Sequence, residues 1–149
     1  MMAEQGTFLV PTLLVNTLST QESEHDKLEP AVLAWLLKAR DDKQGTLDRA
    51  RAAGVKIAVG TDAGFLVYHG QNAAELEEFV KIGFTPMEAI IAATRMGAEC
   101  LDMADEIGTV EAGKYADLVV VDGDPLADII FLQDETKIAQ VFKGGKAFK

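Results

Sequence analysis

Residues 54–64 read Gly-Val-Lys-Ile-Ala-Val-Gly-Thr-Asp-Ala-Gly, and this stretch decides the fold class. Its centre, 55–59, is short, rich in β-branched residues and bounded by Gly54 and Gly60, which is typical of a buried parallel strand. A helical stretch, 47–53, precedes it and ends at Gly54, a residue that enters the left-handed conformation without steric cost. Helix, tight turn and strand in this order predict an α/β fold.

The segments before this stretch fit the same class. Residues 7–13 form a short β-rich apolar run, and Pro11 near its end predicts a buried strand that meets a loop. The polar segment 16–27 predicts a loop, and leucine and valine at helical spacing predict a helix over 31–39.

Two further helices are predicted after it. The first covers about 72–83, where Asn72 and Glu75 have the spacing of a capping box. The second runs from Met87 to about Leu101 and begins with a stronger signal, because Thr85 can cap free N–H groups, Pro86 suits the first helical position and Glu88 can reach back to complete a capping box.

Beyond Asp105 the pattern changes to short strands and turns. Strands are predicted at 108–110, 116–122 and 138–142, and Gly144-Gly145 predicts a hairpin turn before a returning strand. We therefore predict two parts, an α/β part over 1–105 and a β-rich part over 106–149.

Composition excludes several classes of protein. The 149 residues carry 24 acidic and 14 basic side chains, a net charge of −10, which argues against a nucleic-acid ligand. No apolar run approaches the 18 or so residues of a membrane span, so we expect no membrane association. The single cysteine, Cys100, has apolar neighbours and predicts a packed thiol in a reducing compartment, with the cytoplasm as the default.

Asp62 is the candidate catalytic residue, because it stands where the apolar strand ends and a glycine-containing loop begins. In parallel α/β architectures that edge faces the active site. A carboxylate there can bind a divalent metal or act as a general base toward water. An equally open interpretation is that Asp62 caps the following turn.

The two histidines differ in their surroundings. His69 lies seven residues after Asp62 and could bind a substrate carbonyl or a metal, although a lone loop histidine is more often surface structure. His25 lies among charged residues, and we assign it no chemistry. The pair Asp122 and Asp124 superficially resembles a calcium loop but lacks its spacing, so we predict a turn there.

Three strings resemble the amidohydrolase superfamily. They are 54–64, quoted above; 85–89, Thr-Pro-Met-Glu-Ala; and 108–121, Gly-Thr-Val-Glu-Ala-Gly-Lys-Tyr-Ala-Asp-Leu-Val-Val-Val. The resemblance is closest to the imidazolonepropionase-like and Xaa-Pro dipeptidase-like branch, to which 10–13 and 69–76 are also similar. It covers nearly the whole chain.

This resemblance implies the last strands and helices of a (β/α)8 TIM-type barrel, followed by strands of a small composite β-sandwich. Residues 8–12 would be the seventh barrel strand, and Asp62 would end the eighth as metal ligand and general base. His69 would lie on the substrate side, while Asp117 and Asp122 would be structural. The implied activity is hydrolysis of amide, cyclic amide or dipeptide C–N bonds by water activated by a divalent metal, zinc in the first place.

The chain departs from the family pattern in its metal ligands. Family members also use a His-x-His pair, a carboxylated lysine or glutamate, and further histidines, and none of these elements is present. Since a hydrolytic zinc site needs about three protein ligands, we expect the chain alone to be nearly inert. Residues 1–6 read like the end of the sixth barrel helix, so we expect a truncated, split or mis-started gene product.

A partial barrel would also expose an unpaired strand edge and apolar helix faces. We therefore expect self-association or association with the missing part of the barrel. The alternative function is a non-catalytic remnant or protein-interaction module. A solitary sandwich-like binding domain fits less well, because 7–101 have α/β periodicity.

Overall fold

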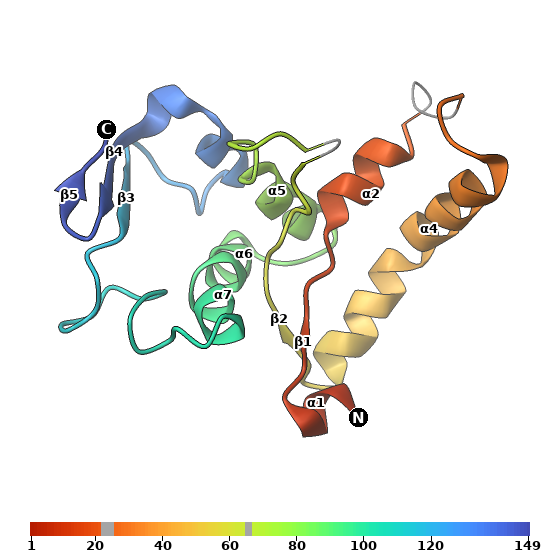
Figure 1. Ribbon diagram of the computed structural model, residues 1–149, viewed down its shortest axis with the longest axis horizontal. Helices are drawn as coiled ribbons and strands as arrows, with labels where there is room; N and C mark the ends of the chain where they lie inside the picture. Colours follow the sequence, from red (N-terminus) through yellow and green to blue (C-terminus); the bar gives the residue numbers. More distant parts are fainter. Residues whose placement is uncertain (22–25, 65–66) are drawn as a thin grey trace.

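The computed structural model describes residues 1–21, 26–64 and 67–149, and it has an α/β architecture. The elements of the first part are α1 (Met2–Gln5), β1 (Phe8–Leu9), α2 (Leu13–Ser19), α4 (Pro30–Ala52), β2 (Lys56–Ile57), α5 (Ala74–Lys81), α6 (Pro86–Ala93) and α7 (Arg95–Cys100). The later elements are β3 (Leu118–Val121), the 3-10 helices η1 (Ile129–Gln133) and η2 (Glu135–Lys137), β4 (Ile138–Lys143) and β5 (Lys146–Ala147). Figure 1 shows β1 and β2 side by side, with α4 on one side and α5 to α7 on the other.

β1 and β2 form a parallel pair, as predicted, but of their four residues only Ile57 is buried. Phe8 is opposite Lys56, and Leu9 is opposite Ile57. Parallel strands need a long crossover, which here contains α2 and α4. The ordered pairing is shorter than the predicted runs, but both strands lie within them.

The crossover corrects two predictions. α2 forms at 13–19, where the sequence predicted the start of a loop, and α4 is one continuous helix of 23 residues instead of two. Gly45 inside α4 disfavours a helix by about 1 kcal/mol relative to alanine. Leu47, which is only 2% exposed, packs α4 against the core, and this burial outweighs the cost of the glycine.

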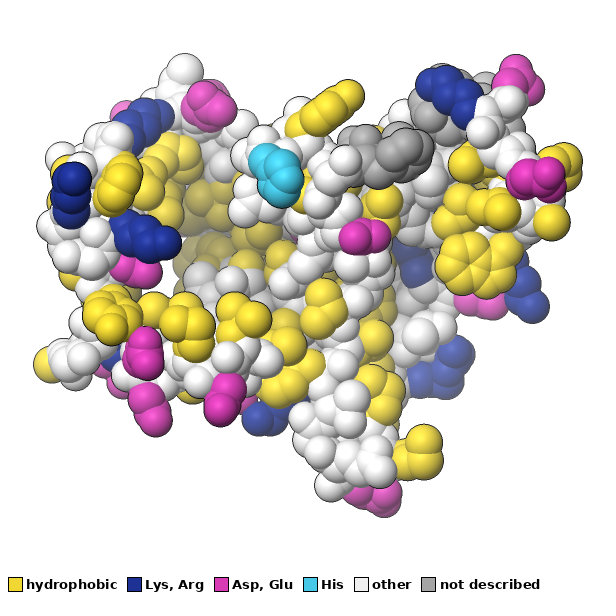
Figure 2. Space-filling model, in the orientation of Figure 1, with side chains coloured by type: hydrophobic (Ala, Val, Ile, Leu, Met, Phe, Trp, Pro, Cys, Tyr) yellow, Lys and Arg dark blue, Asp and Glu magenta, His cyan; other side chains and the backbone are white. Residues whose placement is uncertain are grey.

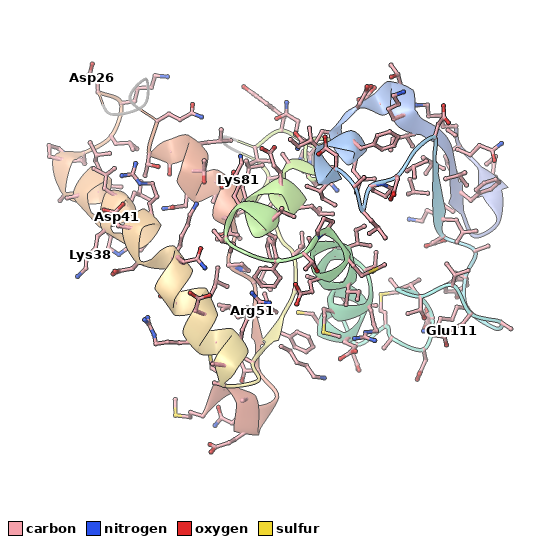
Figure 3. The ribbon with its side chains drawn as sticks, turned by 180° about the vertical axis from the view of Figure 1, so that it is seen from behind. Asp26, Lys38, Asp41, Arg51, Lys81 and Glu111 are labelled. Atoms are coloured by element: carbon pink, nitrogen blue, oxygen red, sulfur yellow. The ribbon has the colours of Figure 1, made fainter. Side chains whose placement is uncertain are left out.

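Arg51 fastens the C-terminal end of α4 to α6. Its guanidinium lies 4.3 Å from the centre of the Phe84 ring and pairs with Glu88 at 3.0 Å. The position of Arg51 at this end of α4 is visible in Figure 3. Glu88 also completes the predicted capping box with Thr85, which is confirmed. One short segment therefore both starts α6 and attaches it to α4.

The predicted helix from Met87 to Leu101 is divided at Thr94. The Thr94 backbone has φ −111° and ψ −84°, and its hydroxyl donates to the carbonyl of Ile90. The carbonyl of Ala92 accepts a hydrogen bond from the backbone N–H of Val59, just after β2. The Ala92 carbonyl, which would accept a hydrogen bond within a continuous helix, thus accepts one from the strand segment instead, and the helix is interrupted there.

The C-terminal residues form a three-stranded antiparallel sheet in the order β3-β4-β5. The predicted turn at Gly144-Gly145 is confirmed, since both glycines have positive φ, 57° and 78°, as a two-residue hairpin requires. The strand predicted at 108–110 is wrong, because this segment has no strand pairing. Val119 and Val120 are 60% and 43% exposed, on opposite faces of the sheet.

Among the described residues, a hydrophobic core joins β1, β2, α2, α4, α5 and α6 to η1. Its buried members are Leu13, Leu47, Ile57, Leu76, Phe79, Ile82, Phe84, Ala89, Ala92 and Ile129. All but Ile129 belong to the first part, and Ile129 carries η1 onto α5. The boundary at 105–106 stays a prediction. Cys100 is exposed, so the prediction of a packed thiol is wrong. Among the described residues, no helix is both long enough and apolar enough to cross a membrane.

Candidate functional site

The candidate site lies where β1 and β2 end. The carbonyl of Leu9 accepts a hydrogen bond from the N–H of Ala58 at 3.0 Å, so the backbones remain paired beyond the strands. A Cβ atom at Gly60 would lie only 2.5 Å from Cγ1 of Val10. An alanine at position 60 would therefore force Val10 to move, and the segments that follow the two strands are in direct contact.

Asp62 follows this contact immediately and is exposed. Its backbone has φ 50°, a left-handed conformation that is uncommon for a side chain but tolerated better by aspartate than by most residues. None of the described residues donates a hydrogen bond to the Asp62 carboxylate, so the capping interpretation finds no partner among them. The carboxylate is available to a ligand.

His69 lies in a tight turn on the same connection. The N–H of Gln71 donates to the carbonyl of Tyr68, which leaves His69 and Gly70 as the two central residues of the turn. Gly70 has φ 96°, and the His69 side chain is exposed, shown in cyan in Figure 2. Across the described ranges no hydrogen bond or ion pair joins His69 to Asp62. His25 lies outside the described residues.

Helix α5 contains a buried carboxylate, Glu75, for which the sequence predicted a different hydrogen-bond partner. Glu75 is 0% exposed, and its two oxygens accept hydrogen bonds from the backbone N–H groups of Leu13 at 2.7 Å and Leu14 at 2.8 Å. The predicted capping box between Asn72 and Glu75 is therefore wrong, because α5 has no side-chain cap. Glu75 instead caps α2, about sixty residues away.

Burial decides the ionisation of Glu75. Loss of hydration raises its pKa to about 6, against the hydrogen bonds from Leu14 and Leu13, which lower it. The nearby Glu78 raises the pKa further, and Lys43 lowers it. The carboxyl thus has an ionisation equilibrium near neutral pH in the wall of the core.

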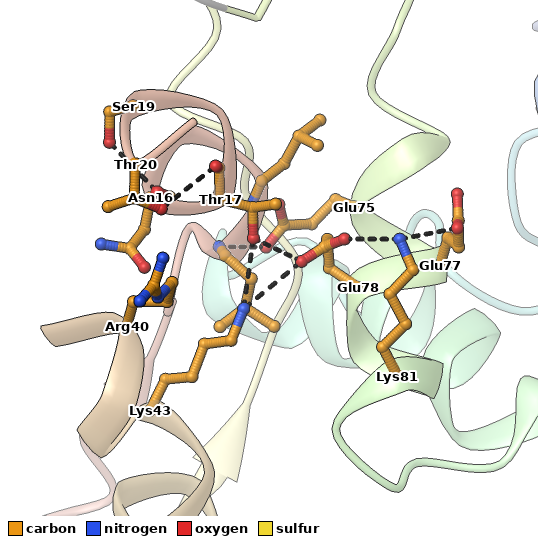
Figure 4. A network of polar contacts seen from close by, with 12 residues as sticks. Asn16, Thr17, Ser19, Thr20, Arg40, Lys43, Glu75, Glu77, Glu78 and Lys81 are labelled. Atoms are coloured by element: carbon orange, nitrogen blue, oxygen red, sulfur yellow. Dashed lines mark hydrogen bonds and ion pairs between the residues drawn. The ribbon is translucent and has the colours of Figure 1, made fainter. Parts of the chain in front are cut away.

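Glu78 makes a second connection one turn along α5 (Figure 4). It accepts a hydrogen bond from the Thr17 hydroxyl at 2.5 Å and pairs with Lys43 at 3.4 Å and Lys81 at 2.9 Å. Burial alone would raise the pKa of Glu78, but the bonds from Thr17 and Lys81 hold it below the ordinary value. Two acids three residues apart in the apolar stripe of Leu76 and Phe79 are the sequence signal that could have revealed this network.

The described residues do not by themselves form a metal site. Nowhere in 1–21, 26–64 and 67–149 do three histidine, cysteine, aspartate or glutamate side chains gather closely enough to hold an ion. An open cleft of about 540 Å³ lies between α2, α4 and α5, lined by Lys43 and Lys81 among others. Asp62 and His69 do not line it.

A family model described as "Amidohydrolase family" matches residues 1–148. The chain belongs to this family. The resemblance inferred from the sequence is thereby confirmed, and amidohydrolase relatives include both an imidazolonepropionase and a Xaa-Pro dipeptidase.

Curated relatives match most or all of the chain. The ochratoxinase of Aspergillus niger is 34% identical over 151 aligned residues, which cover 100% of this chain and 31% of that protein. The imidazolonepropionase of Pyrobaculum arsenaticum is 39% identical over 89 residues, 58% of this chain and 22% of that protein. The amidohydrolase chain therefore spans about a third or less of these relatives.

Solved structures confirm that the fold is shared. A Xaa-Pro dipeptidase with bound methionine in its active site superposes with a TM-score of 0.86 at 35% identity, covering 99% of this chain and 36% of that one. The A. niger ochratoxinase structure gives a TM-score of 0.82 at 33% identity, covering 98% of this chain and 33% of that one. The family membership and the α/β fold agree.

Proposed function

We propose that the chain supplies the Asp62-bearing part of a metal-dependent amidohydrolase site that hydrolyses amide, cyclic amide or dipeptide C–N bonds, and that it is inactive alone. The observation that carries this proposal is the position of Asp62. It is an exposed carboxylate with no described partner, at the carboxyl ends of two paired parallel strands. The similarity to a Xaa-Pro dipeptidase favours a dipeptide among the substrate classes.

In this proposal β1 and β2 are the seventh and eighth strands of a (β/α)8 barrel, and β3 to β5 belong to a composite β-sandwich. Asp62 accepts a proton from the attacking water and returns it to the leaving nitrogen, the usual work of a general base that becomes a general acid. His69 contacts the substrate carbonyl, for which its exposed position in the turn leaves room.

Asp62 is also our proposed metal ligand, but the described residues do not fit a complete site. Zinc centres of hydrolases need about three protein ligands, so the others must come from outside the described part of this chain. We propose a divalent cation, zinc first, for the completed site, and the cytoplasm as its compartment. No step of hydrolysis is assigned to the isolated chain.

The metal ligands and neighbouring strands that the described residues do not supply define the partner we propose. Both outer edges of the β1-β2 pair lack strand neighbours among the described residues, and unpaired edges tend to associate. The apolar side chains of Val119, Val120 and Tyr115 are also exposed. We propose that the remaining barrel strands pair with the edges of β1 and β2, and that the remaining sandwich strands cover the exposed apolar side chains of the later part. A second copy of the chain associates there when those strands are absent.

The test is reconstitution. The chain is expressed together with the portion of the Xaa-Pro dipeptidase that it does not match, and Xaa-Pro hydrolysis and zinc content are measured. The controls are Asp62→Ala and Asp122→Ala, since Asp122 is likewise exposed and directly follows a strand. We expect activity and zinc in the complex, reduced by Asp62→Ala only. Equal activity in both variants would contradict the role of Asp62.

The alternative, a non-catalytic interaction module, is favoured by the exposed apolar side chains alone. It predicts association without hydrolysis in every reconstitution. Size-exclusion chromatography with light scattering separates the outcomes, because a clean monomer that forms no complex would contradict both association proposals.

A further inference from the structure

α2 has no cap of its own. Its N-cap residue, Thr12, has a left-handed backbone with φ 45°, and its side chain makes no capping hydrogen bond. The N–H groups of the first turn belong to Leu13 and Leu14, two residues that are only 2% and 9% exposed, and an unpaired donor there is costly. Both are satisfied by Glu75.

The residue that caps α2 comes from α5, the helix that follows the connection containing Asp62. We call this connection, from the end of β2 to the start of α5, the Asp62 connection. β2 leads through Asp62 and the His69 turn into α5, and Glu75 is the second residue of α5. β1 leads through Val10 and Thr12 into α2. Glu75 therefore joins α5, the helix after β2, to the start of α2, the helix after β1. Between these helices and the strands, Val10 and Gly60 are already in contact.

We propose that Glu75 is a positioning residue: its buried carboxylate fixes the backbone after β1 against the Asp62 connection, and so sets where Asp62 stands at the strand edge. The contact itself does not depend on the proposed function. Its consequence for chemistry rests on that function, because a hydrolase tolerates little displacement of its general base.

Other groups that face Glu75 have been assigned above. Glu78 lies one turn further on α5, and Lys43 reaches in from α4. From α2 come the two N–H groups and, next to Glu78, the Thr17 hydroxyl. Because the pKa of Glu75 is about 6, its protonation can be followed near neutral pH.

The experiment is a pH titration of the full chain by nuclear magnetic resonance. The side-chain carboxyl carbon of Glu75 is observed in the wild type, together with the backbone amides of Leu13 and Leu14 and those of 60–62. We expect all of them to shift with one midpoint near pH 6, the midpoint of Glu75. In the Glu75→Gln variant, this transition should be lost both at Leu13 and Leu14 and at 60–62.

Two variants remove competing causes. Asp62→Asn removes the Asp62 carboxyl and His69→Gln removes the imidazole, so neither side chain can itself cause a transition at 60–62. The transition at 60–62 should persist in both. The wild-type titration decides the matter even where Glu75→Gln does not fold, because the observed carboxyl reports its own midpoint.

Two results would overturn the proposal. If Leu13 and Leu14 follow Glu75 but 60–62 do not, Glu75 caps α2 without positioning Asp62. If neither group follows it, the contact is not maintained in solution. Reconstituted hydrolysis is not needed for either result, so failure of the proposed function and failure of this inference are distinguishable.

Discussion

Two carboxylates near the strand ends have opposite surroundings. Glu75 is fully buried, bonded to two backbone N–H groups and part of a network that spans α2, α4 and α5. Asp62 is exposed and has no described partner. A buried acid that satisfies backbone donors contributes to architecture, whereas an exposed acid at a strand edge is free for chemistry. The predictions below test this division.

Replacing Glu75 with alanine should have the largest effect on stability. It would leave the Leu13 and Leu14 donors buried without acceptors, at a cost of about 2–4 kcal/mol in the free energy of unfolding. Urea denaturation measures this value. Glu77→Ala on the same helix is the matched control and should cost less than about 1 kcal/mol, because its partners Lys81 and Gln133 are both exposed. Equal losses would contradict the special role of Glu75.

Gly60→Ala should disturb the contact between the two post-strand segments. The added Cβ would meet Val10 at 2.5 Å, and such overpacking costs about 1–3 kcal/mol. The double variant with Val10→Ala should recover most of the loss, since it removes the clashing methyl group. Thermal denaturation of both variants checks the coupling, and no recovery would place the strain elsewhere.

The pH dependence of stability should distinguish Glu75 from the other shifted glutamates. Because the pKa of Glu75 is raised from 4.5 to about 6 in the folded state, its contribution is fully present below about pH 4.5 and lost as pH rises through 6. The change amounts to about 2 kcal/mol. The lowered pKa values of Glu77, Glu78 and Glu88 give the opposite sign, stability lost in acid.

This contribution is isolated by comparing wild type with Glu75→Gln. The difference in unfolding free energy, measured from pH 4 to pH 8, should favour the wild type more at the acidic end. A difference that is independent of pH would show that Glu75 has an ordinary pKa in the folded chain.

Asp62→Asn should have the smallest effect on stability and the largest on chemistry. An exposed side chain without described partners should change the unfolding free energy by less than about 0.5 kcal/mol. In the reconstituted complex, hydrolysis should fall by about 10²-fold or more, as expected for loss of a general base. A stability loss comparable to that of Glu75→Ala would overturn the division between the two acids.

The sequence alone determined the local features whose signals lie within a few residues. A parallel strand within 55–59, the capping box of Thr85 and Glu88, and the Gly144-Gly145 hairpin were all predicted and observed. The same is true of the family, because its motifs are contiguous strings. Asp62 was placed at a strand end by the same local reasoning, while its catalytic role and that of His69 stay predictions.

The tertiary structure alone decided the features that depend on distant partners. The spacing of Glu75 predicted a cap for its own helix, but its carboxylate bonds to Leu13 and Leu14, which lie more than sixty positions earlier in the chain. Thr94 interrupts a periodic helix where Val59 takes the carbonyl of Ala92. A buried polar group must find a partner somewhere in space, and a spacing rule describes only the neighbours along the chain. Local propensity therefore indicated which segments form strands and turns, with the exception of 108–110, and long-range hydrogen bonding decided which residues hold the strand ends together.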